Sequence, residues 1–374
     1  MKIHYLLATR YDNFGDYVIN LELIRLLCGQ GQVEIDDFGC DSTFLDQLKS
    51  EIGNYRRPAT TLKTLSGLLG AFMKNQTPNF LVLSPGAMAI LPKPKWIFRG
   101  FCMYLVLSLL RLRGTKIIRL GVSRKPQGHS LVDRLMILWM RQTDGIYFRD
   151  QISLNYYKPH SHNGQRIGYF PDLALYLPCK ISDEVSARSN VIGLSFRYPE
   201  KSTVGESFSL QGLVDLSVDW HERGYQCRFY HQVEADAKYG AEVAETFRRA
   251  TQRAEMKVIE VNSQDAADHE YVQPQALLTN RLHVALLCLL AGGLPVPVCS
   301  KNENAKLFGL FERIGLRSLC LDPALSEELK AAHIEHVLAN RVKALEGFPE
   351  KLFALKEEGR ILLKEIFNCE KITT

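Results

Sequence analysis

Short apolar segments alternate along this chain with longer segments that have the apolar spacing of helices. Segments that are apolar throughout predict strands covered on both faces, as in parallel sheets. They lie within residues 3–8, 80–86, 116–123, 191–197, 226–230 and 257–261, and in 145–153, where the strand runs into a helix start. Helical segments lie at 17–27, 209–223, 235–254 and 301–315, and from 326 to about 372 with a break at 347–349. This alternation predicts a doubly wound α/β fold, which binds ligands beyond the carboxyl ends of its strands.

A polar stretch without periodicity, residues 180–190, separates two halves of similar pattern. We therefore expect two Rossmann-like domains facing a cleft. The first would comprise residues 1–180 and the second residues 190–374, with C-terminal helices that can pack back on the first domain. The cleft between two such halves is where a ligand is expected.

A helix with a charged entrance is predicted in the second half. Asn280 is suited to be its N-cap, and residues 284–291 are apolar on every side, which indicates a buried helix. Gly292 and Gly293 end that helix, and Pro295 prevents it from resuming before a short buried strand.

Arg281 and His283 stand at the entrance of this otherwise uncharged helix. A helix N-terminus carries partial positive charge and unpaired N–H groups, so an added arginine favours binding of phosphate or carboxylate. His283 adds a group that titrates near neutral pH. The alternative is structural, with Arg281 in a surface ion pair and His283 as a core histidine with its hydrogen bonds satisfied.

Three further basic residues are expected near the same sheet edge. Arg197 and His231 each end a predicted strand, and Lys306 lies near a helix start. In a parallel sheet these ends meet along one edge, and two arginines beside a helix N-terminus suit a small anion with two acidic groups. Taken alone, each residue could equally well have a structural or surface role instead of a role in anion binding.

The loop that follows the first strand is polar and contains Gly15. It has neither the Gly-x-Gly-x-x-Gly pattern nor the P-loop pattern, so the two common nucleotide-binding signatures are absent from it. Asp16 either caps the following helix or acts in chemistry.

Residues 96–110 form an apolar segment, and lysines and arginines flank it on both sides within residues 93–116. Arg99 and Gly100 interrupt it, and it is too short to cross a bilayer, which needs about 20 apolar residues. It is either a buried helix of the first domain or a helix that lies on an anionic membrane surface.

The composition is that of an ordinary globular protein: 374 residues, 46% hydrophobic and 23% charged. The net charge of +5 permits an anionic substrate or membrane surface and gives no reason to expect nucleic acid. Nine scattered cysteines without a Cys-x-x-Cys pair indicate reduced thiols in the cytoplasm, with no zinc site and no disulfide framework. The apolar N-terminal run is too short for a signal peptide. No metal is expected, because the sequence shows no evident carboxylate cluster and arginines can neutralise the anion.

The charged helix entrance resembles the Arg-Leu-His-x9-Gly-x-Pro signature of the polysaccharide pyruvyltransferase family. Other short elements of that family follow in the same order over roughly residues 5–320. The matching residues are Arg281, Leu282, His283, Gly293 and Pro295, with Asn13, Gly15, Asp16, Arg149, Asp150, Ser153, Pro171 and Asp172. Where the family has a run of glycines only Gly86 remains, so we expect a differently shaped loop on the acceptor side.

The resemblance implies a fold similar to GT-B glycosyltransferases and no cofactor. Phosphoenolpyruvate, the co-substrate, would bind the second domain, and a sugar acceptor, free, nucleotide-linked or lipid-linked, the first. The product would be a pyruvate ketal on two hydroxyls of a sugar in a bacterial surface polysaccharide or its precursor. The expected location is the cytoplasm or the inner face of the membrane.

We assign roles on this basis. Arg197 and Arg281 would clamp phosphate and carboxylate, with Lys306, Asn13 and Gly15 also on the binding side. His283 would be the general acid or a phosphate donor, and Asp16 or His231 would accept the hydroxyl proton.

Two other functions remain open. The first is a sugar-nucleotide glycosyltransferase on the same fold. The Glu-x7-Glu pair common in retaining members is absent at the expected place, because Glu303 and Glu312 are one residue too far apart. The second is a non-catalytic member that binds an anionic glycan without turnover.

Overall fold

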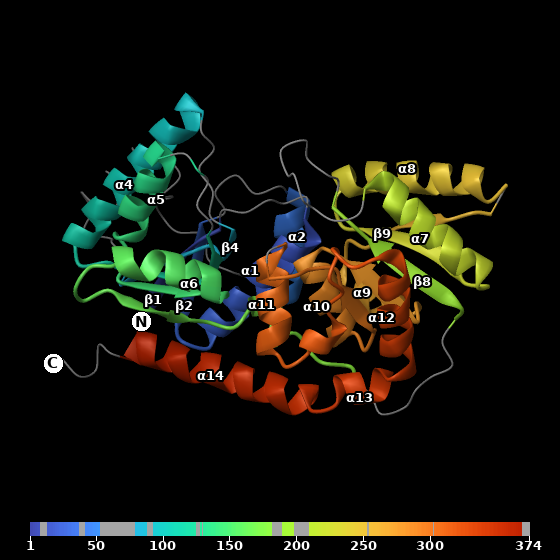
Figure 1. The fold of residues 1–374 in the computed structure, drawn as a ribbon. Helices are drawn as coiled ribbons and strands as arrows, with labels where there is room; N and C mark the ends of the chain where they lie inside the picture. Colours follow the sequence, from blue (N-terminus) through green and yellow to red (C-terminus); the bar gives the residue numbers. More distant parts are fainter. Residues whose placement is uncertain are drawn as a thin grey trace. The chain divides into compact units, whose positions relative to one another are not determined.

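The structure is a computed structural model of the 374-residue chain. It describes residues 1–7, 13–36, 42–52, 79–87, 93–124, 128, 130–181, 189–197, 209–252, 254–301 and 303–368. Two compact units, each with its own parallel sheet, make up the chain (Figure 1). The first comprises Met1–Tyr11, Asp16–Leu173 and Leu355–Thr374, and the second comprises Asp12–Gly15 and Ala174–Ala354.

The first unit is built on a parallel sheet in the order β2-β1-β3-β5-β6-β7, with β4 paired to β5. Its strands are β1 (Lys2–Leu6), β2 (Gln32–Asp36), β3 (Phe80–Leu83), β4 (Gly86–Ala87), β5 (Lys116–Ser123), β6 (Gly145–Phe148) and β7 (Arg166–Tyr169). The chain runs from β1 outward to β2 and then returns to β3 on the other side of β1. This reversal of strand order makes the C-terminal ends of β1 and β3 the ligand-binding edge that such sheets offer.

Helices cover the first sheet. They are α1 (Phe14–Cys28), α2 (Ser42–Ile52), α4 (Pro94–Leu112), α5 (Ser130–Met140), α6 (Gln151–Tyr157), η1 (Lys158–His160) and η2 (Leu173–Tyr176). The last helix, α14 (Phe348–Asn368), begins in the second unit, and its later part belongs to the first, where Phe367 packs against Phe80 with ring centroids 4.8 Å apart. Among the described residues, no helix has the length and hydropathy needed to cross a bilayer.

The second unit repeats the architecture with a parallel sheet in the order β10-β9-β8-β11-β12. Its strands are β8 (Val191–Ser195), β9 (Gln226–His231), β10 (Lys257–Glu260), β11 (Ala276–Thr279) and β12 (Pro295–Pro297). Its helices are α7 (Leu210–Glu222), α8 (Glu234–Ala250), α9 (Gln264–Glu270), α10 (Leu282–Leu290), α11 (Ala305–Arg313), η3 (Arg317–Leu319), α12 (Glu327–Ala339) and α13 (Arg341–Leu345). Strand order reverses here between β8 and β11.

The predicted α/β class and the two Rossmann-like halves are confirmed. The pattern of the sequence missed several elements, including β2, β7 and the interior strand β11. Strand β11 has only four residues and stands directly before a long apolar helix, so its apolar run merged with the helical pattern. Of the predicted linker 180–190, residues 182–188 lie outside the described part of the chain.

Helix α10 is buried from Val284 to Leu290, as its all-round apolar pattern predicts. Gly292 follows with a φ of 92°, a left-handed conformation that ends the helix and favours glycine.

The prediction that Asn280 is the N-cap is wrong. Arg281 occupies that position, because the Asn280 side chain is held in a bond to another strand end, described below.

Candidate anion site at the edge of the second sheet

Four strand ends of the second unit bring the predicted basic residues to one edge. Arg197 lies two residues beyond β8, His231 ends β9, and Arg281 lies two residues beyond β11. Lys306 is the second residue of α11, the helix that follows β12. Strands β9, β8, β11 and β12 are neighbours and parallel, so their C-terminal ends lie along the same edge. The reversal between β8 and β11 falls at the centre of this group, where doubly wound sheets bind ligands.

Asn280 ties three of these segments together. Its side-chain oxygen accepts a hydrogen bond of 2.9 Å from the backbone N–H of Arg197. Its backbone carbonyl accepts a bond of 2.8 Å from the side-chain amide of Asn304, which immediately precedes α11. Arg197, Arg281 and the start of α11 are therefore held at fixed positions relative to one another.

Thr279, the last residue of β11, holds the residues between β11 and α10 in place by two hydrogen bonds. Its hydroxyl donates to the carbonyl of Ser195 at 2.6 Å and accepts from the backbone N–H of Arg281 at 2.9 Å. Thr279 is completely buried, so both bonds form away from competing water. The backbone of Arg281 is thereby fixed at the N-terminus of α10.

The side chain of Arg281 forms an ion pair with Asp236, in the first turn of α8. Only 17% of the arginine side chain and 3% of the aspartate side chain are exposed. The structural alternative proposed an ion pair at the surface. The ion pair is present, but its carboxylate is buried. A guanidinium has five N–H donors, so one carboxylate orients it without exhausting its capacity to bind an anion.

Sequence reasoning did not select Asp236. It lies in the first turn of a helix, where acidic residues are common because they interact well with the helix dipole. Only the structure distinguishes it, since 2% of Asp236 is exposed while the nearby Glu234 is exposed.

His231 is half-buried at the end of β9. Burial lowers its pKa below the usual value, and the carboxylates of Glu260 and Asp236 partly oppose that shift. The imidazole is consequently neutral at neutral pH and able to accept a proton. Asp236 thus acts electrostatically on both His231 and Arg281.

His283 lies in the first turn of α10 and is partly exposed, whereas the alternative interpretation places it in the core. Gly15 packs against it. A Cβ atom on Gly15 would lie 2.7 Å from the Cβ and Cγ atoms of His283, which no side chain there can tolerate without a shift. A glycine at this position is what allows residues 13–15 to approach the imidazole.

Asn13 shapes the turn that presents Gly15. Its side-chain oxygen accepts a bond of 3.1 Å from the backbone N–H of Gly15, which caps the start of α1. Asp16 follows in the first turn of α1, belongs to the first unit and is partly exposed. Asn13 therefore supplies the cap for which the sequence suggested Asp16.

The other motif residues of the first unit bind one another. Arg149 donates to Asp172 at 2.8 Å and to Ser123 at 2.9 Å. Ser123 donates to Asp150 at 2.6 Å, and Asp150 caps α6 by accepting from the backbone N–H of Ser153 at 2.8 Å. This network joins the C-terminal ends of β5, β6 and β7.

The sequence also predicts a differently shaped loop after Gly86. Residues 88–92 of that loop lie outside the described part of the chain.

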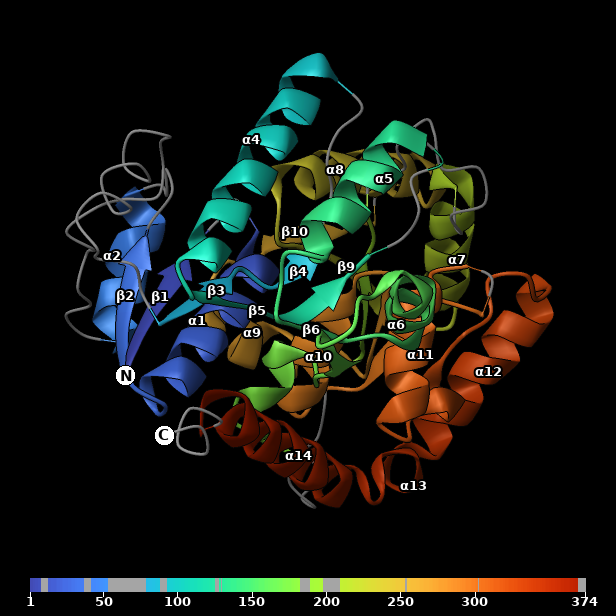
Figure 2. The same cartoon turned by 90° about the vertical axis from the view of Figure 1, so that its left-hand side faces the viewer.

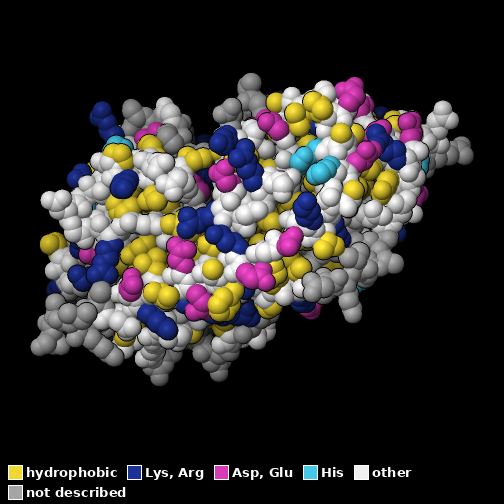
Figure 3. Space-filling model, turned by 60° about the horizontal axis from the view of Figure 1, so that its bottom comes forward, with side chains coloured by type: hydrophobic (Ala, Val, Ile, Leu, Met, Phe, Trp, Pro, Cys, Tyr) yellow, Lys and Arg dark blue, Asp and Glu magenta, His cyan; other side chains and the backbone are white. Residues whose placement is uncertain are grey.

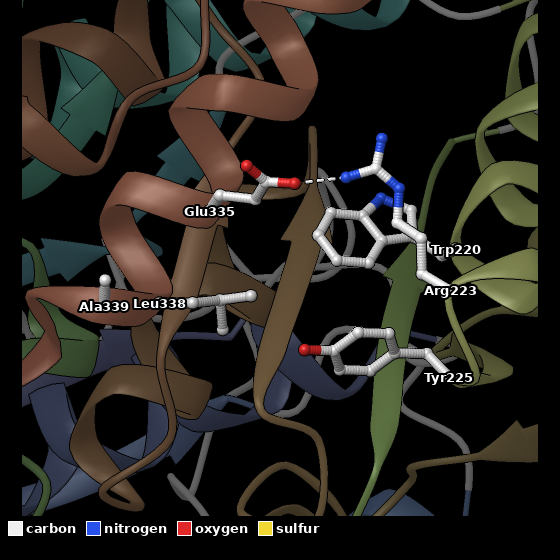
Figure 4. Close-up of a pocket in the computed structure, with 6 residues that line it drawn as sticks. All are labelled: Trp220, Arg223, Tyr225, Glu335, Leu338 and Ala339. Carbon is white, nitrogen blue, oxygen red and sulfur yellow. Dashed lines mark hydrogen bonds and ion pairs between the residues drawn. The ribbon is translucent and has the colours of Figure 1, made fainter.

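A pocket of about 580 Å³ lies elsewhere in the second unit. It is lined by Trp220, Arg223, Tyr225, Glu335, Leu338 and Ala339 (Figure 4). Arg223 and Glu335 point toward each other and form an ion pair. Tyr225 directly precedes β9, so the pocket lies toward the N-terminal end of that strand, away from the basic residues.

Within the described residues, no group of three or more His, Cys, Asp or Glu side chains is placed to hold a metal ion.

Similar folds occur among solved structures of proteins that bind sugar nucleotides. Anabaena Alr3699/HepE in complex with UDP-glucose has a TM-score of 0.64 at 11% identity, over 100% of both chains. UDP-GlcNAc 2-epimerase from Neisseria meningitidis, bound to UDP-GlcNAc, has a TM-score of 0.59 at 10% identity, over 98% of this chain and 100% of the other. A glycosyltransferase from Rickettsia africae has a TM-score of 0.60 at 11% identity, over 100% of this chain and 99% of the other. These likenesses establish the GT-B-like fold.

Comparison of the sequence with curated proteins gave no match. A family model described as polysaccharide pyruvyl transferase matches residues 13–293. The matched range begins at the cap of α1 and ends just beyond α10, so it includes Arg197, His231, Arg281 and His283. The chain therefore belongs to the polysaccharide pyruvyl transferase family and is a transferase.

Proposed function

We propose that this enzyme transfers the three carbons of phosphoenolpyruvate to two hydroxyls of one sugar, forming a pyruvate ketal and releasing phosphate. Family membership supports pyruvyl transfer to a polysaccharide. The observation that carries the choice of donor is Arg281, fixed at the N-terminus of α10 by Thr279 and Asp236. A pre-oriented guanidinium beside a helix N-terminus suits a small ligand that carries phosphate and carboxylate.

The donor would bind along the edge formed by Arg197, Arg281 and Lys306. Arg197 is exposed, and Lys306 is partly exposed in the first turn of α11. One guanidinium can bind two oxygens of a carboxylate or phosphate at once, so two arginines match the two anionic groups of phosphoenolpyruvate. Together with Lys306 they outweigh the negative charge of Asp236.

The reaction requires a proton on the methylene carbon of the donor. In our assignment His283 delivers it, which leaves positive charge at the carbon that carries the phosphate oxygen. The first sugar hydroxyl attacks that carbon and gives up its proton. The carbon–oxygen bond to phosphate then breaks, phosphate leaves, and the second hydroxyl attacks and loses its proton. One donor and one diol thus yield one ketal and one phosphate.

A base is needed for the hydroxyl protons. His231 and Asp16 are the two candidates from the sequence. The lowered pKa of His231 supports it in this role, because a neutral imidazole can accept a proton at neutral pH. Arg197 and Arg281 would stabilise the departing phosphate by direct hydrogen bonds.

A sugar-nucleotide glycosyltransferase is the second candidate function. Its support is the fold shared with proteins whose structures contain UDP-glucose or UDP-GlcNAc. The two functions differ in the donor, since only the glycosyltransferase needs a nucleoside diphosphate. The acceptor we propose is a sugar of a bacterial surface polysaccharide or its precursor, modified on the cytoplasmic side.

Product analysis tests the proposal. The enzyme would be incubated with phosphoenolpyruvate and a panel of free, nucleotide-linked and lipid-linked sugars, and acceptor mass and released phosphate would be measured. We expect one acceptor to gain the mass of one pyruvate less one water, with one phosphate released per ketal. Transfer of a sugar from a UDP-sugar, with no phosphate released from phosphoenolpyruvate, would overturn the proposal in favour of the glycosyltransferase.

A further inference from the structure

Helix α4 carries an exposed apolar stripe along most of its length. Its members recur at intervals of three or four residues, which places them on one face of the helix. They are Phe98 (70% exposed), Phe101 (49%), Leu105 (42%), Leu109 (38%) and Leu112 (82%). Exposed single apolar residues are common, but a continuous stripe of large ones marks an interaction surface.

The opposite face of α4 already has a partner. Val106, Leu107 and Leu110 are buried against Leu81 and Ile117 of the first sheet. The buried-helix interpretation of residues 93–116 therefore accounts for one face of the helix and leaves the exposed stripe unexplained.

Helix α5 extends the same surface. It packs beside α4 on the same face of the first sheet, as the two views show (Figures 1 and 2). Leu131 and Leu138 of α5 are 54% and 44% exposed. We call the exposed stripe of α4 together with these two leucines the α4–α5 surface.

The charged residues of α4 and of its two flanks have one sign. Residues 93–116 contain six basic residues and no aspartate or glutamate: Lys93, Lys95, Arg99, Arg111, Arg113 and Lys116. Lysines 93 and 95 stand exposed at the start of α4, while Arg113 and Lys116 are exposed at its end. Trp96 is 39% exposed in the first turn, where its ring could lie at the level of lipid headgroups.

Helix α14, whose later part belongs to the same unit, provides a contrast. It also has exposed apolar residues, Phe353 and Ile361, but these alternate with charges of both signs, including an ion pair between Arg360 and Glu357. Figure 3 brings the α14 side of the molecule forward, and acidic, basic and apolar side chains are intermingled on it. Such a face has no preference for an anionic surface.

We propose that the α4–α5 surface binds the enzyme to an anionic lipid bilayer. The apolar stripe would enter the headgroup region, and the basic residues at both ends of α4 would contact anionic lipids. No described helix crosses a bilayer, so this contact is peripheral. The proposal is independent of the donor chemistry, because it rests on the first unit alone.

Vesicle co-sedimentation without any substrate tests it directly. Wild-type enzyme should bind vesicles that contain phosphatidylglycerol, and bind neutral phosphatidylcholine vesicles much more weakly. Phe98→Gln/Phe101→Gln should abolish most of the binding. The matched control is Phe353→Gln/Ile361→Gln on α14, which removes two comparably exposed apolar side chains and should bind like wild type.

A second pair of variants tests the charge contribution. Lys95→Gln/Lys116→Gln should lower the partition coefficient about fivefold per residue, since each cation near an anionic surface contributes to that extent. Lys351→Gln/Lys364→Gln, two exposed lysines of α14, should have little effect. Unchanged melting temperatures in all variants show that the fold is intact.

Two results would overturn the proposal. One is vesicle binding that is absent, or that is equally sensitive to the α4 and α14 substitutions. The other is concentration-dependent self-association that Phe98→Gln/Phe101→Gln abolishes, which would assign the surface to a second copy of the chain. Because the assay contains neither donor nor acceptor, its outcome is independent of whether the proposed pyruvyl transfer is right.

Discussion

The C-terminal edges of the two sheets hold motif residues of the same types but differ in what surrounds them. In the first unit, Arg149 is bound to the fully buried Asp172 and to Ser123. In the second unit, Arg281 is bound to buried Asp236, while Arg197 and His283 stay exposed or partly exposed. An arginine beside a strand end is thus compatible with a structural or a ligand-binding role. We use the burial of the arginine and the motif residues around it to choose between these two roles.

The comparison has a direct consequence for mutagenesis. Substitutions at the first edge should lower stability, because they leave a buried partner unsatisfied. Substitutions of Arg197 or His283 at the second edge should lower binding or turnover with small effects on stability, because these side chains are exposed or partly exposed. The following predictions test this division, beginning with the largest effect.

Replacing His283 with alanine should reduce turnover by about 10²- to 10⁴-fold, the usual contribution of a general acid. The melting temperature should stay near that of wild type, because the side chain is partly exposed. The measurement is the rate of phosphate release at saturating donor. His269→Ala, at a histidine with a 72% exposed side chain on α9, is the control and should be fully active. An active His283→Ala enzyme would remove the residue from the mechanism.

Replacing Asp172 with asparagine should destabilise the fold by about 3–5 kcal/mol, because Arg149 would be left as a buried charge without its carboxylate. Urea unfolding measures this loss. Glu234→Gln breaks the exposed ion pair with Lys238 and should cost below about 1 kcal/mol. Equal effects of the two substitutions would contradict the structural role assigned to the first edge.

Replacing Gly15 with alanine should lower turnover about 100-fold, because a displacement of about 1 Å in a catalytic group has that effect. The new Cβ would press on His283. Gly309→Ala on α11 is the control, since a Cβ there meets no atom within 4 Å. If donor affinity is kept while the rate falls, the glycine acts by positioning the imidazole.

The smallest expected effect is the pH dependence of stability at His231. Its pKa is lowered in the fold, so below about pH 6.5 the unfolded chain takes up a proton before the folded protein does. Stability is therefore full above about pH 6.5 and declines as the pH falls toward the folded pKa. The ring is half exposed, so the loss should be under about 1 kcal/mol. Urea unfolding from pH 8 to 5.5 should show a shallower decline in His231→Gln, and an identical decline would contradict the shift.

The sequence allowed prediction of the elements that carry the site, because apolar runs and helical spacing are local signals. Strand ends at Arg197 and His231 followed from those runs, and the parallel sheet brought them to one edge. Asp236 could not be found in this way, since its importance depends on packing between α8 and α10 rather than on its neighbours in the chain. The division of α4 into a buried and an exposed apolar face likewise depends on the sheet beneath it.

Calorimetric titration of phosphoenolpyruvate and of UDP-sugars into wild type and Arg281→Ala tests the central claim most directly. Phosphoenolpyruvate should bind wild type, and the substitution should weaken it by about 10- to 100-fold, as expected for loss of a hydrogen bond from a charged group. Arg248→Ala, on the exposed face of α8, should leave its affinity unchanged. Binding of a UDP-sugar that Arg281→Ala weakens, or phosphoenolpyruvate affinity that Arg281→Ala does not alter, would contradict the assignment of this edge as the donor site.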